Sequence, residues 1–468
     1  MRTHASPSPC ETETDEPIGD KAVADEAKRI EHLRLKRVNR DQVTPVPARL
    51  DALLPADHLA RLVWGAVERL DLTAFYARTT VREDGPGQTA TDPKILLALW
   101  LYATSQGVTR ARELNRLCVE HLAYIWLCGG VTMNYHTLSD FRVQHAAALD
   151  HLMTEVLGHL IHAGVVEFEQ GAQDGMRVRA SAGAASFHRQ PTLEKSLTQA
   201  RRLVAALEPS TPAGQDEDED EDEDEDGGRG RGARKRAARE RVKRLEQALA
   251  EMPAAKAAKP KDEEGEARVS STDPEARVMK MADGGYRPAY NWEFAVDSAQ
   301  LVILGVEVVM TGSDKAQMPP MLDQVKTRCG RLPDDWLADG GFVSLNAIEQ
   351  ASLSGVRVLA PVPTPKDKTR DPSVPLSTDS RAIAEWRQRM ASDEAKQTYK
   401  LRAATVECVN AQARTCNGVQ QVPVRGQCKV LCLALWVAIT HNLLIALQHL
   451  VHWGASPIPS PSPSPALA

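Results

Sequence analysis

The sequence predicts an α/β protein in which helices flank a mixed sheet, preceded by an all-α N-terminal domain and interrupted by a long charged insertion. Apolar residues recur at helical spacing from about residue 53 to residue 163. Alternation typical of strands begins at Glu167 and returns at Tyr290. Between these strand regions lie dense runs of acidic and then basic residues, which predict an insertion that is partly helical and partly disordered.

Composition and charge narrow the class of protein. The 468 residues are enough for two or three domains, and 42% hydrophobic with 26% charged residues is typical of a soluble globular chain. The net charge of −6 includes eleven consecutive acidic residues at 216–226. Without them, 57 basic residues face 52 acidic ones, so the rest of the chain is mildly basic and a nucleic-acid partner is permitted.

Neither a secretory signal nor a membrane span is expected. The N-terminus is polar, and the longest apolar stretch, Val430 to Ile439, is followed by Thr440, His441 and Asn442. That stretch is shorter than the ~20 residues that a membrane helix needs. The eight cysteines form no CxxC pair, which favours free thiols in a reducing compartment. We therefore expect a cytoplasmic protein with no membrane partner.

The N-terminal domain is predicted as short helices joined by Gly turns, as in a helix-turn-helix bundle. In the sequence Thr91-Asp92-Pro93, Asp92 is placed to cap a helix with Pro at its first position. The predicted helices are 95–105, ended by Gln106-Gly107; 109–119; 121–128, ended by Gly129-Gly130; and 137–162. Arg110, Arg112 and Arg116 could meet DNA phosphates or bases, and an exposed charged face is the equal alternative.

The region after Val165 is predicted to alternate strands and helices. A strand surrounds Asp174, and the insertion then holds a helix, the acidic run, a Gly/Arg segment at 227–232 and a basic helix at 233–252. The further strands are 290–297, 301–310, 336–338 and 356–360, and the further helices are 317–329, 345–352, 382–390, 395–415 and 429–450. Periodicity alone supports no more than a mixed α/β fold.

Three acidic residues are candidates for phosphodiester chemistry, which uses carboxylates that converge on a pair of metal ions about 3.5–4 Å apart. Asp174 lies in a strand-like segment before Gly175, and a turn aspartate is its alternative. Asp339 ends a short apolar strand before Gly340-Gly341, and a plain strand-to-helix turn is equally open. The predicted helix 395–415 places Glu407 at mid-helix.

Two cations accompany Glu407. Lys400 and Arg414 stand seven residues to either side, so on one helix the three side chains would share nearly one face. This pattern is either a solvated ion-pair stripe or a metal ligand between two phosphate-binding cations. Asp273, Asp283, Asp297 and Asp314 are alternative acids, with Asp297 the first of them to test. Lys280 and Arg287 could contact DNA, although a solvated surface is the alternative. His441-Asn442 could be catalytic, although a hydrogen-bonded core pair is the alternative.

Several segments resemble the successive blocks of insertion-sequence DDE transposases, in the same order. They are QDGMRVRASAG, STDPEARVMKMADGGYRPAYN, TGSDKAQMPPMLDQV, LADGGF and YKLRAATVECVNAQAR. Farther upstream, TDPKILLALWLY and YHTLSDFR are similar to the N-terminal domain that accompanies those enzymes. The resemblance covers roughly residues 40–450.

The resemblance implies an RNase H-like catalytic domain whose acidic positions fall on Asp174, Asp339 and Glu407. These would be the catalytic residues and the ligands of two Mg²⁺ ions, with Mn²⁺ as a substitute. It also implies that Tyr399, Arg402 and the basic side chain at Arg414, where Lys is more usual, hold DNA near the scissile phosphate.

The implied partners are double-stranded DNA, at the element's terminal repeats and at the target site, and a second copy of the chain in the synaptic complex. The protein would then be nucleoid-associated when bound. The implied organisation is a disordered segment 1–40, a helical DNA-binding domain 41–163, a catalytic domain 164–452 with an insertion at 185–270, and a disordered Ser-Pro tail 453–468.

Two other functions stay open. The first is a DNA-binding protein of transposase descent without catalysis, and the second is an interaction protein that works through the charged segment 216–252. The acidic run is unusual for the family and would repel DNA near the cleft. Met176 and Cys408 beside the acids are also unusual, although neither removes a ligand.

Overall fold

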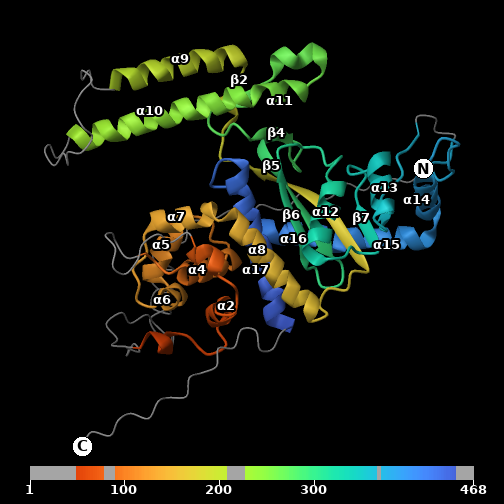
Figure 1. Cartoon of the computed structure of the whole chain (residues 1–468), viewed down its shortest axis with the longest axis horizontal. Coiled ribbons are helices and arrows are strands. Elements are labelled where there is room, and N and C mark those ends of the chain that lie inside the picture. Colours follow the sequence, from red (N-terminus) through yellow and green to blue (C-terminus); the bar gives the residue numbers. More distant parts are fainter. Residues whose placement is uncertain (1–48, 78–89, 208–226, 366–369, 450–468) are drawn as a thin grey trace, which may run out of the picture. The chain divides into compact units, whose positions relative to one another are not determined.

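The computed structural model describes residues 49–77, 90–207, 227–365 and 370–449 (Figure 1). The predicted disordered segment 1–40, the acidic run 216–226 and the Ser-Pro tail 453–468 lie outside these residues. The fold is mixed α/β with a helical N-terminal region, as the sequence predicts, and its main sheet is mixed and has six strands.

The N-terminal region is a set of short helices around α4 (Pro93–Ser105). The Asp92 side chain accepts a hydrogen bond from the Lys94 backbone N–H, and Pro93 takes the first helical position, which confirms the predicted cap. Most of α4 is buried. It packs against α2 (Leu59–Val67), α6 (Leu122–Cys128) and α7 (Tyr135–Gln144). The other elements of this region are η1 (Leu50–Leu53), α3 (Thr73–Tyr76), α5 (Ala111–Glu120) and α8 (Ala146–His162).

Two predicted boundaries in this region are wrong. The predicted helix 137–162 is two helices, because His145 has non-helical angles (φ −117°, ψ 36°) between α7 and α8. Its ring packs against Phe75 and Phe141, with centroid distances of 5.3 and 4.7 Å, so a tertiary contact stabilises the break. The helix expected from residue 109 begins two residues later, with Arg110 as its extended N-cap.

The sheet is built around β1 (Gln170–Arg179). On one side β1 pairs antiparallel with β5 (Tyr286–Asp297), and β5 pairs antiparallel with β4 (Arg277–Lys280) and β6 (Ile303–Val309). On the other side β1 pairs parallel with β7 (Asp335–Ala338), which pairs parallel with β8 (Arg357–Leu359). The strand β4 was not predicted, and β5 begins four residues before the predicted start at Tyr290.

The C-terminal helices include one break that changes the expected site. The predicted helix 395–415 is α15 (Asp393–Ala404) and α16 (Val406–Thr415), separated at Thr405 (φ −106°, ψ −96°). Thr405 is buried, and its hydroxyl donates to the Arg402 carbonyl. The other helices of this part, α12 (Met318–Cys329), α13 (Leu345–Leu353) and α14 (Arg381–Ala391), follow the prediction within one or two residues.

The last helix, α17 (Gln427–His449), packs against both the helical region and the sheet. The Asn442 side chain pairs with the Ile303 backbone of β6 through two hydrogen bonds of 2.9 and 2.8 Å, and His441 bonds the Leu301 carbonyl. His441 and Asn442 are therefore hydrogen-bonded groups of the core, which was the structural alternative to a catalytic role. Contrary to the sequence estimate, α17 is long and apolar enough to span a membrane, but 72% of its most apolar window is buried inside the protein.

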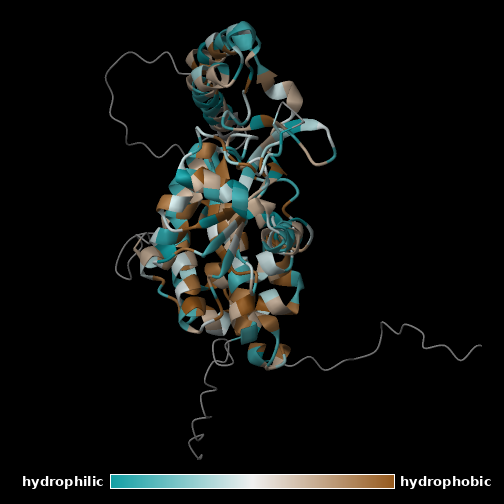
Figure 2. Ribbon diagram, turned by 90° about the vertical axis from the view of Figure 1, so that its right-hand side faces the viewer, coloured by the Kyte–Doolittle hydropathy of each residue, from teal (hydrophilic) through white to brown (hydrophobic). Residues whose placement is uncertain are grey.

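The charged insertion is a helical hairpin of α9 (Gln190–Leu207) and α10 (Gly227–Ala250), followed by α11 (Met252–Ala257) and η3 (Lys261–Glu266). Leu193 and Leu197 pack against Leu245 and Ala248 in a small core of its own. After η2 (Ala184–Ser186), the short strands β2 (Phe187–His188) and β3 (Val269–Ser270) pair at its base. The helix α10 includes the Gly/Arg segment 227–232 and so begins before the predicted start of the basic helix at residue 233. Much of the hairpin is hydrophilic in Figure 2.

Candidate active site

Asp174, Asp339 and Glu407 line one open cavity of about 690 Å³. They come from three separate elements, since Asp174 is on β1, Asp339 follows β7 and Glu407 is on α16. The cavity is otherwise lined by four basic residues, one asparagine, small residues and the start of the β4–β5 turn. These further residues are Gly175, Arg177, Lys280, Met281, Ala282, Gly312, Arg402, Asn410, Ala411 and Arg414.

The parallel pairing of β1 and β7 brings the two aspartates together. Gln173 pairs with Ala338, so Asp174 and Asp339 are the next residues on two neighbouring parallel strands. Residues side by side on neighbouring strands project from the same face of a sheet, so Asp174, midway along β1, lies beside Asp339 at the edge where β7 ends. Glu407 reaches the same edge from the first turn of α16, not from mid-helix as predicted, because the chain turns at Thr405.

Arg402 lies between two of the acids. Its guanidinium nitrogens are 3.7 Å from Asp174 Oδ1 and 2.5 Å from Glu407 Oε1. Asn410, one turn after Glu407, donates from Nδ2 to Asp174 Oδ2 over 3.1 Å. Both carboxylates are therefore held by groups on or next to α16, and the break at Thr405 positions these groups around β1.

Burial raises the pKa of Asp174 to about 6. Arg402 opposes this shift, whereas the nearby charges of Asp339 and Glu407 add to it. A carboxyl group whose pKa is raised by burial and by neighbouring acids marks a site where negative charge is concentrated, and such a site favours a cation.

The donor set suits magnesium. Carboxylate oxygens are its preferred protein ligands, and a few suffice because Mg²⁺ keeps several waters. The buried Asn410 Oδ1, at the same edge, also has no hydrogen-bond partner in the structure. However, no three acidic, His or Cys side chains within the described residues lie close enough together to hold one ion as they stand. Arg402 occupies the space between the acids, so ion binding would require it to move.

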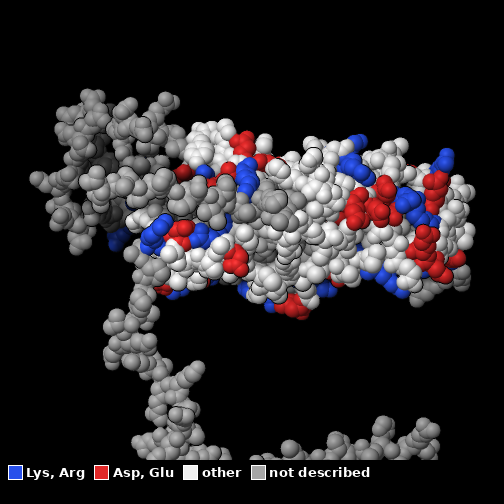
Figure 3. Space-filling model, turned by 90° about the horizontal axis from the view of Figure 1, so that it is seen from below, with Lys and Arg blue, Asp and Glu red and all other residues white. Residues whose placement is uncertain are grey.

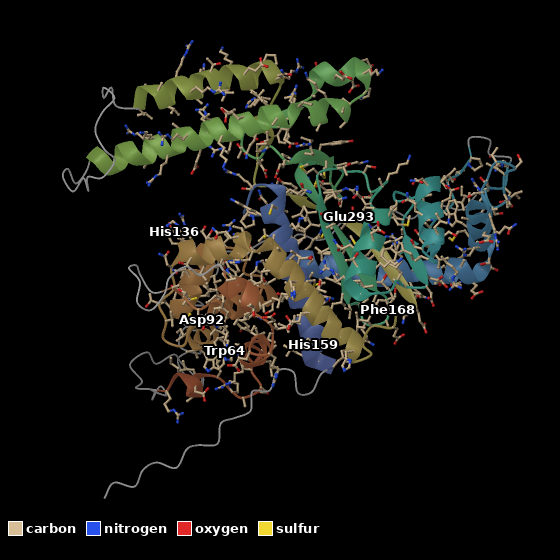
Figure 4. All side chains as sticks on the ribbon, viewed as in Figure 1. Trp64, Asp92, His136, His159, Phe168 and Glu293 are labelled. Carbon is tan, nitrogen blue, oxygen red and sulfur yellow. The ribbon has the colours of Figure 1, made fainter. Side chains whose placement is uncertain are left out.

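A buried polar network lies behind Asp174 and was not predicted. The Asn291 amide donates to Glu293 Oε1 (2.7 Å) and to Asp314 Oδ1 (2.6 Å), and Arg177 pairs with Asp314 Oδ2 (3.1 Å). Figure 4 labels Glu293 on β5. Gly175 faces this network, because a Cβ atom there would lie 2.7–2.9 Å from oxygens of Asp314, Asn291 and Glu293. The interruption of an apolar strand by Asn291 and Glu293 was the available sequence signal.

The remaining alternative acids have structural roles. Asp297, the first of these to be tested on sequence grounds, is buried and accepts backbone N–H bonds from Phe168 and Ala299. Asp273 accepts the Tyr290 hydroxyl and the Gly426 N–H. Asp283 pairs with Arg287 at the β4–β5 turn. Only Asp314 of the four adjoins the candidate site, as a partner of Arg177.

The predicted DNA-contacting residues fall into two groups. Arg402 and Arg414 line the cavity, and Tyr399 hydrogen-bonds Arg402. Lys400 lies on α15, bonds Gln397 and does not line the cavity, so the predicted shared face with Arg414 is wrong. Arg110 and Arg112 are exposed at the start of α5, where Arg112 stacks 5.1 Å from the centre of the Tyr135 ring. Their contact with DNA stays a prediction.

Removing the cation between the acids should strengthen metal binding. For Arg402→Gln we expect Mn²⁺ to bind on the order of tenfold more tightly in the absence of DNA, because the ion no longer competes with a guanidinium, an effect of about 1.4 kcal/mol. Titration calorimetry measures this directly. Arg414→Gln, which removes a cavity cation that contacts neither acid in the structure, is the matched control. Weaker Mn²⁺ binding by Arg402→Gln would contradict the expectation.

Stability should decrease as pH rises through the neutral range. Burial, with Asp314 nearby, raises the pKa of Glu293 from 4.5 to about 9. The folded protein then binds a proton that the unfolded chain has lost, so this stabilising contribution is complete below pH 4.5 and is lost as pH approaches 9. Urea unfolding at pH 5 to 9 should show a decline of at most about 1.4 kcal/mol per pH unit. In Glu293→Gln the free energy of unfolding should decline less steeply with pH. An unchanged slope in this variant would show that Glu293 does not cause the decline.

Comparison with known protein families gives two matches. Residues 48–144 match the family described as Transposase domain (DUF772), and residues 366–445 match the family described as Transposase DDE domain. The second match contains Arg402, Glu407 and Arg414, whereas Asp174 and Asp339 lie outside both. Neither the curated proteins nor the solved structures gave a significant match.

Proposed function

Because the chain belongs to the insertion-sequence DDE transposases, we propose that it hydrolyses DNA at the ends of its element and joins them to target DNA. The observation that best supports the proposal is that Asp174, Asp339 and Glu407 line one cavity together with Arg402 and Arg414. Three carboxylates flanked by guanidinium groups combine metal-ligand and phosphate-binding chemistry.

The proposed catalytic domain is RNase H-like. The order β6–β5–β1–β7–β8, with antiparallel pairing on one side of β1 and parallel pairing on the other, fits this arrangement. In this proposal the helical region carries the DNA-recognition surface, including Arg110 and Arg112. The chain would act in the cytoplasm on double-stranded DNA, as a homodimer when two ends are brought together.

Asp174, Asp339 and Glu407 would hold two Mg²⁺ ions, with Mn²⁺ as a substitute. When bound there, the metal supplies Lewis-acid stabilisation of the attacking and leaving oxygens. Arg402 and Arg414 would bind the phosphate oxygens once Arg402 leaves the acids, and bidentate contact with a phosphate suits a guanidinium. Asn410 would keep Asp174 oriented through its 3.1 Å hydrogen bond.

In the first step water attacks phosphorus in line, the bond from phosphorus to the 3′-oxygen breaks, and a 3′-hydroxyl is released. In the second step that hydroxyl attacks a target phosphodiester and displaces another 3′-oxygen. Neither step needs a covalent bond to the protein. With the pKa of Asp174 at about 6, its carboxylate is mainly ionised at neutral pH and available as a ligand.

The test is nicking of a labelled duplex that carries the element end and its flank, by the full-length chain in Mg²⁺. We expect cleavage at the boundary that leaves a 3′-hydroxyl, with none in EDTA and none on a duplex whose end sequence is scrambled. DNA binding without nicking in either Mg²⁺ or Mn²⁺ would instead support the non-catalytic DNA-binding alternative.

A further inference from the structure

A basic groove lies at the base of the insertion hairpin, away from the acidic cavity. Two adjoining cavities of about 530 and 340 Å³ share Arg244, Thr272 and Arg425. One wall is the face of α10 that carries Arg241, Lys243 and Arg244, and the other is formed by Arg425 with Lys429 in the first turn of α17. We call these five residues the hairpin groove cations.

These cations are mostly not neutralised by neighbouring acids. Arg244 is 3.5 Å from Glu240, whereas no ion pair within the described part of the chain involves Arg241, Lys243, Arg425 or Lys429. All four are exposed. Nearby on α10, Arg234 and Arg236 are exposed as well, which extends the basic surface toward the tip of the hairpin.

The acids that line the groove are already engaged. Glu251 pairs with Arg277 over 2.5 Å. Asp273 accepts the Gly426 N–H, and Glu275 Oε2 accepts the Gln427 N–H over 2.5 Å, so both satisfy the backbone at the start of α17. The five hairpin groove cations outnumber the three acids that line the groove, so the groove carries a net positive charge. By contrast, the face of the molecule in Figure 3 shows Lys and Arg interspersed with Asp and Glu between wide uncharged areas.

We propose that the hairpin groove cations bind the sugar–phosphate backbone of duplex DNA at a place separate from the cleavage site. Unpaired Lys and Arg side chains on two facing walls suit the phosphates, and they carry no base specificity. The choice of DNA as the partner rests on the proposed function.

The connection to β1 sets the distance between the two sites. Arg425 Nε donates to the Ser181 carbonyl (3.3 Å), and Ser181 follows Asp174 by seven residues on the same extended segment. At ~3.3 Å per residue the separation is on the order of 20 Å. With 3.4 Å per base pair, the groove would contact phosphates about six base pairs from the scissile bond.

The test compares two pairs of substitutions that change the charge equally. Lys243→Gln with Lys429→Gln removes one cation from each wall of the groove. Lys195→Gln with Arg202→Gln removes two exposed cations from α9, on the same hairpin and outside the groove. Binding of the full-length chain to a 40-base-pair duplex of arbitrary sequence is measured by fluorescence anisotropy in EDTA, at several salt concentrations.

We expect the groove pair to weaken binding about tenfold at low salt and to reduce the slope of log K against log salt by about 2, with no comparable change in the α9 pair. Equal losses in both pairs, or no loss in the groove pair, would overturn the proposal. Because binding in EDTA needs no catalysis, failure of the chain to nick DNA would count against the proposed function and not against the groove.

Discussion

Each of the single substitutions Asp174→Asn, Asp339→Asn and Glu407→Gln is expected to reduce Mg²⁺-dependent nicking by about 10³-fold or more. Each change removes a negative oxygen ligand while it keeps the size of the side chain. A loss of 10³ corresponds to about 4 kcal/mol of transition-state stabilisation. Single-turnover nicking of the labelled element end measures the effect, and anisotropy on the same duplex shows whether DNA binding survives.

Asp334→Asn is the matched control. Asp334 is exposed and does not line the cavity. It immediately precedes β7, whereas Asp339 immediately follows β7, so the two residues lie at opposite ends of that strand. Its nicking rate should stay within about twofold of wild type. Robust nicking by any of the three site variants would mean that the corresponding acid is not a catalytic ligand, even though it lies in the cavity.

Gly175→Ala is expected to reduce nicking by about 10²-fold although it removes no carboxylate and adds no charge. The added Cβ would lie 2.7 Å from Asp314 Oδ1 and 2.9 Å from oxygens of Asn291 and Glu293. These groups are buried and hydrogen-bonded to one another, so either their side chains or β1 next to Asp174 must shift. A displacement of about 1 Å at a catalytic group can cost that factor in rate.

The control for this change is Gly340→Ala. Gly340 follows Asp339 directly, and a Cβ there would meet no atom within 4 Å. We expect near-normal nicking from Gly340→Ala, whereas Gly175→Ala should also lose about 1–3 kcal/mol of stability from overpacking. Urea unfolding separates the two effects, because a soluble, cooperatively folded Gly175→Ala with slow nicking is the expected result. Gly175→Ala with wild-type nicking would show that the network does not position Asp174.

Local patterns in the sequence were sufficient for most elements. The cap at Asp92 and Pro93, the strand through Asp174 and the short strand before Asp339 depend on neighbouring residues, so they could be predicted without tertiary contacts. The family resemblance also named the three acids, which periodicity alone could not distinguish from turn aspartates or an ion-pair stripe.

Tertiary structure decided the breaks and the contacts. The helix breaks at His145 and Thr405 accompany packing of an aromatic ring and burial of a hydroxyl, and local helix propensity does not contain these interactions. The second break moved Glu407 into a first turn and separated Lys400 from it. Likewise, Glu293 became part of the candidate site only because β5 pairs with β1, which places it opposite Gly175 although 118 residues separate them in the chain.

The sequence by itself determined the kind of chain and the order of its elements, because these depend on residue type and short-range spacing, and the family resemblance named the three candidate acids. Only the tertiary structure decided that Arg402 lies between Asp174 and Glu407, and that the basic helix of the insertion faces Arg425 and Lys429. These arrangements join residues far apart in the chain, and their electrostatic energies depend on distance and burial, which the order of residues does not specify.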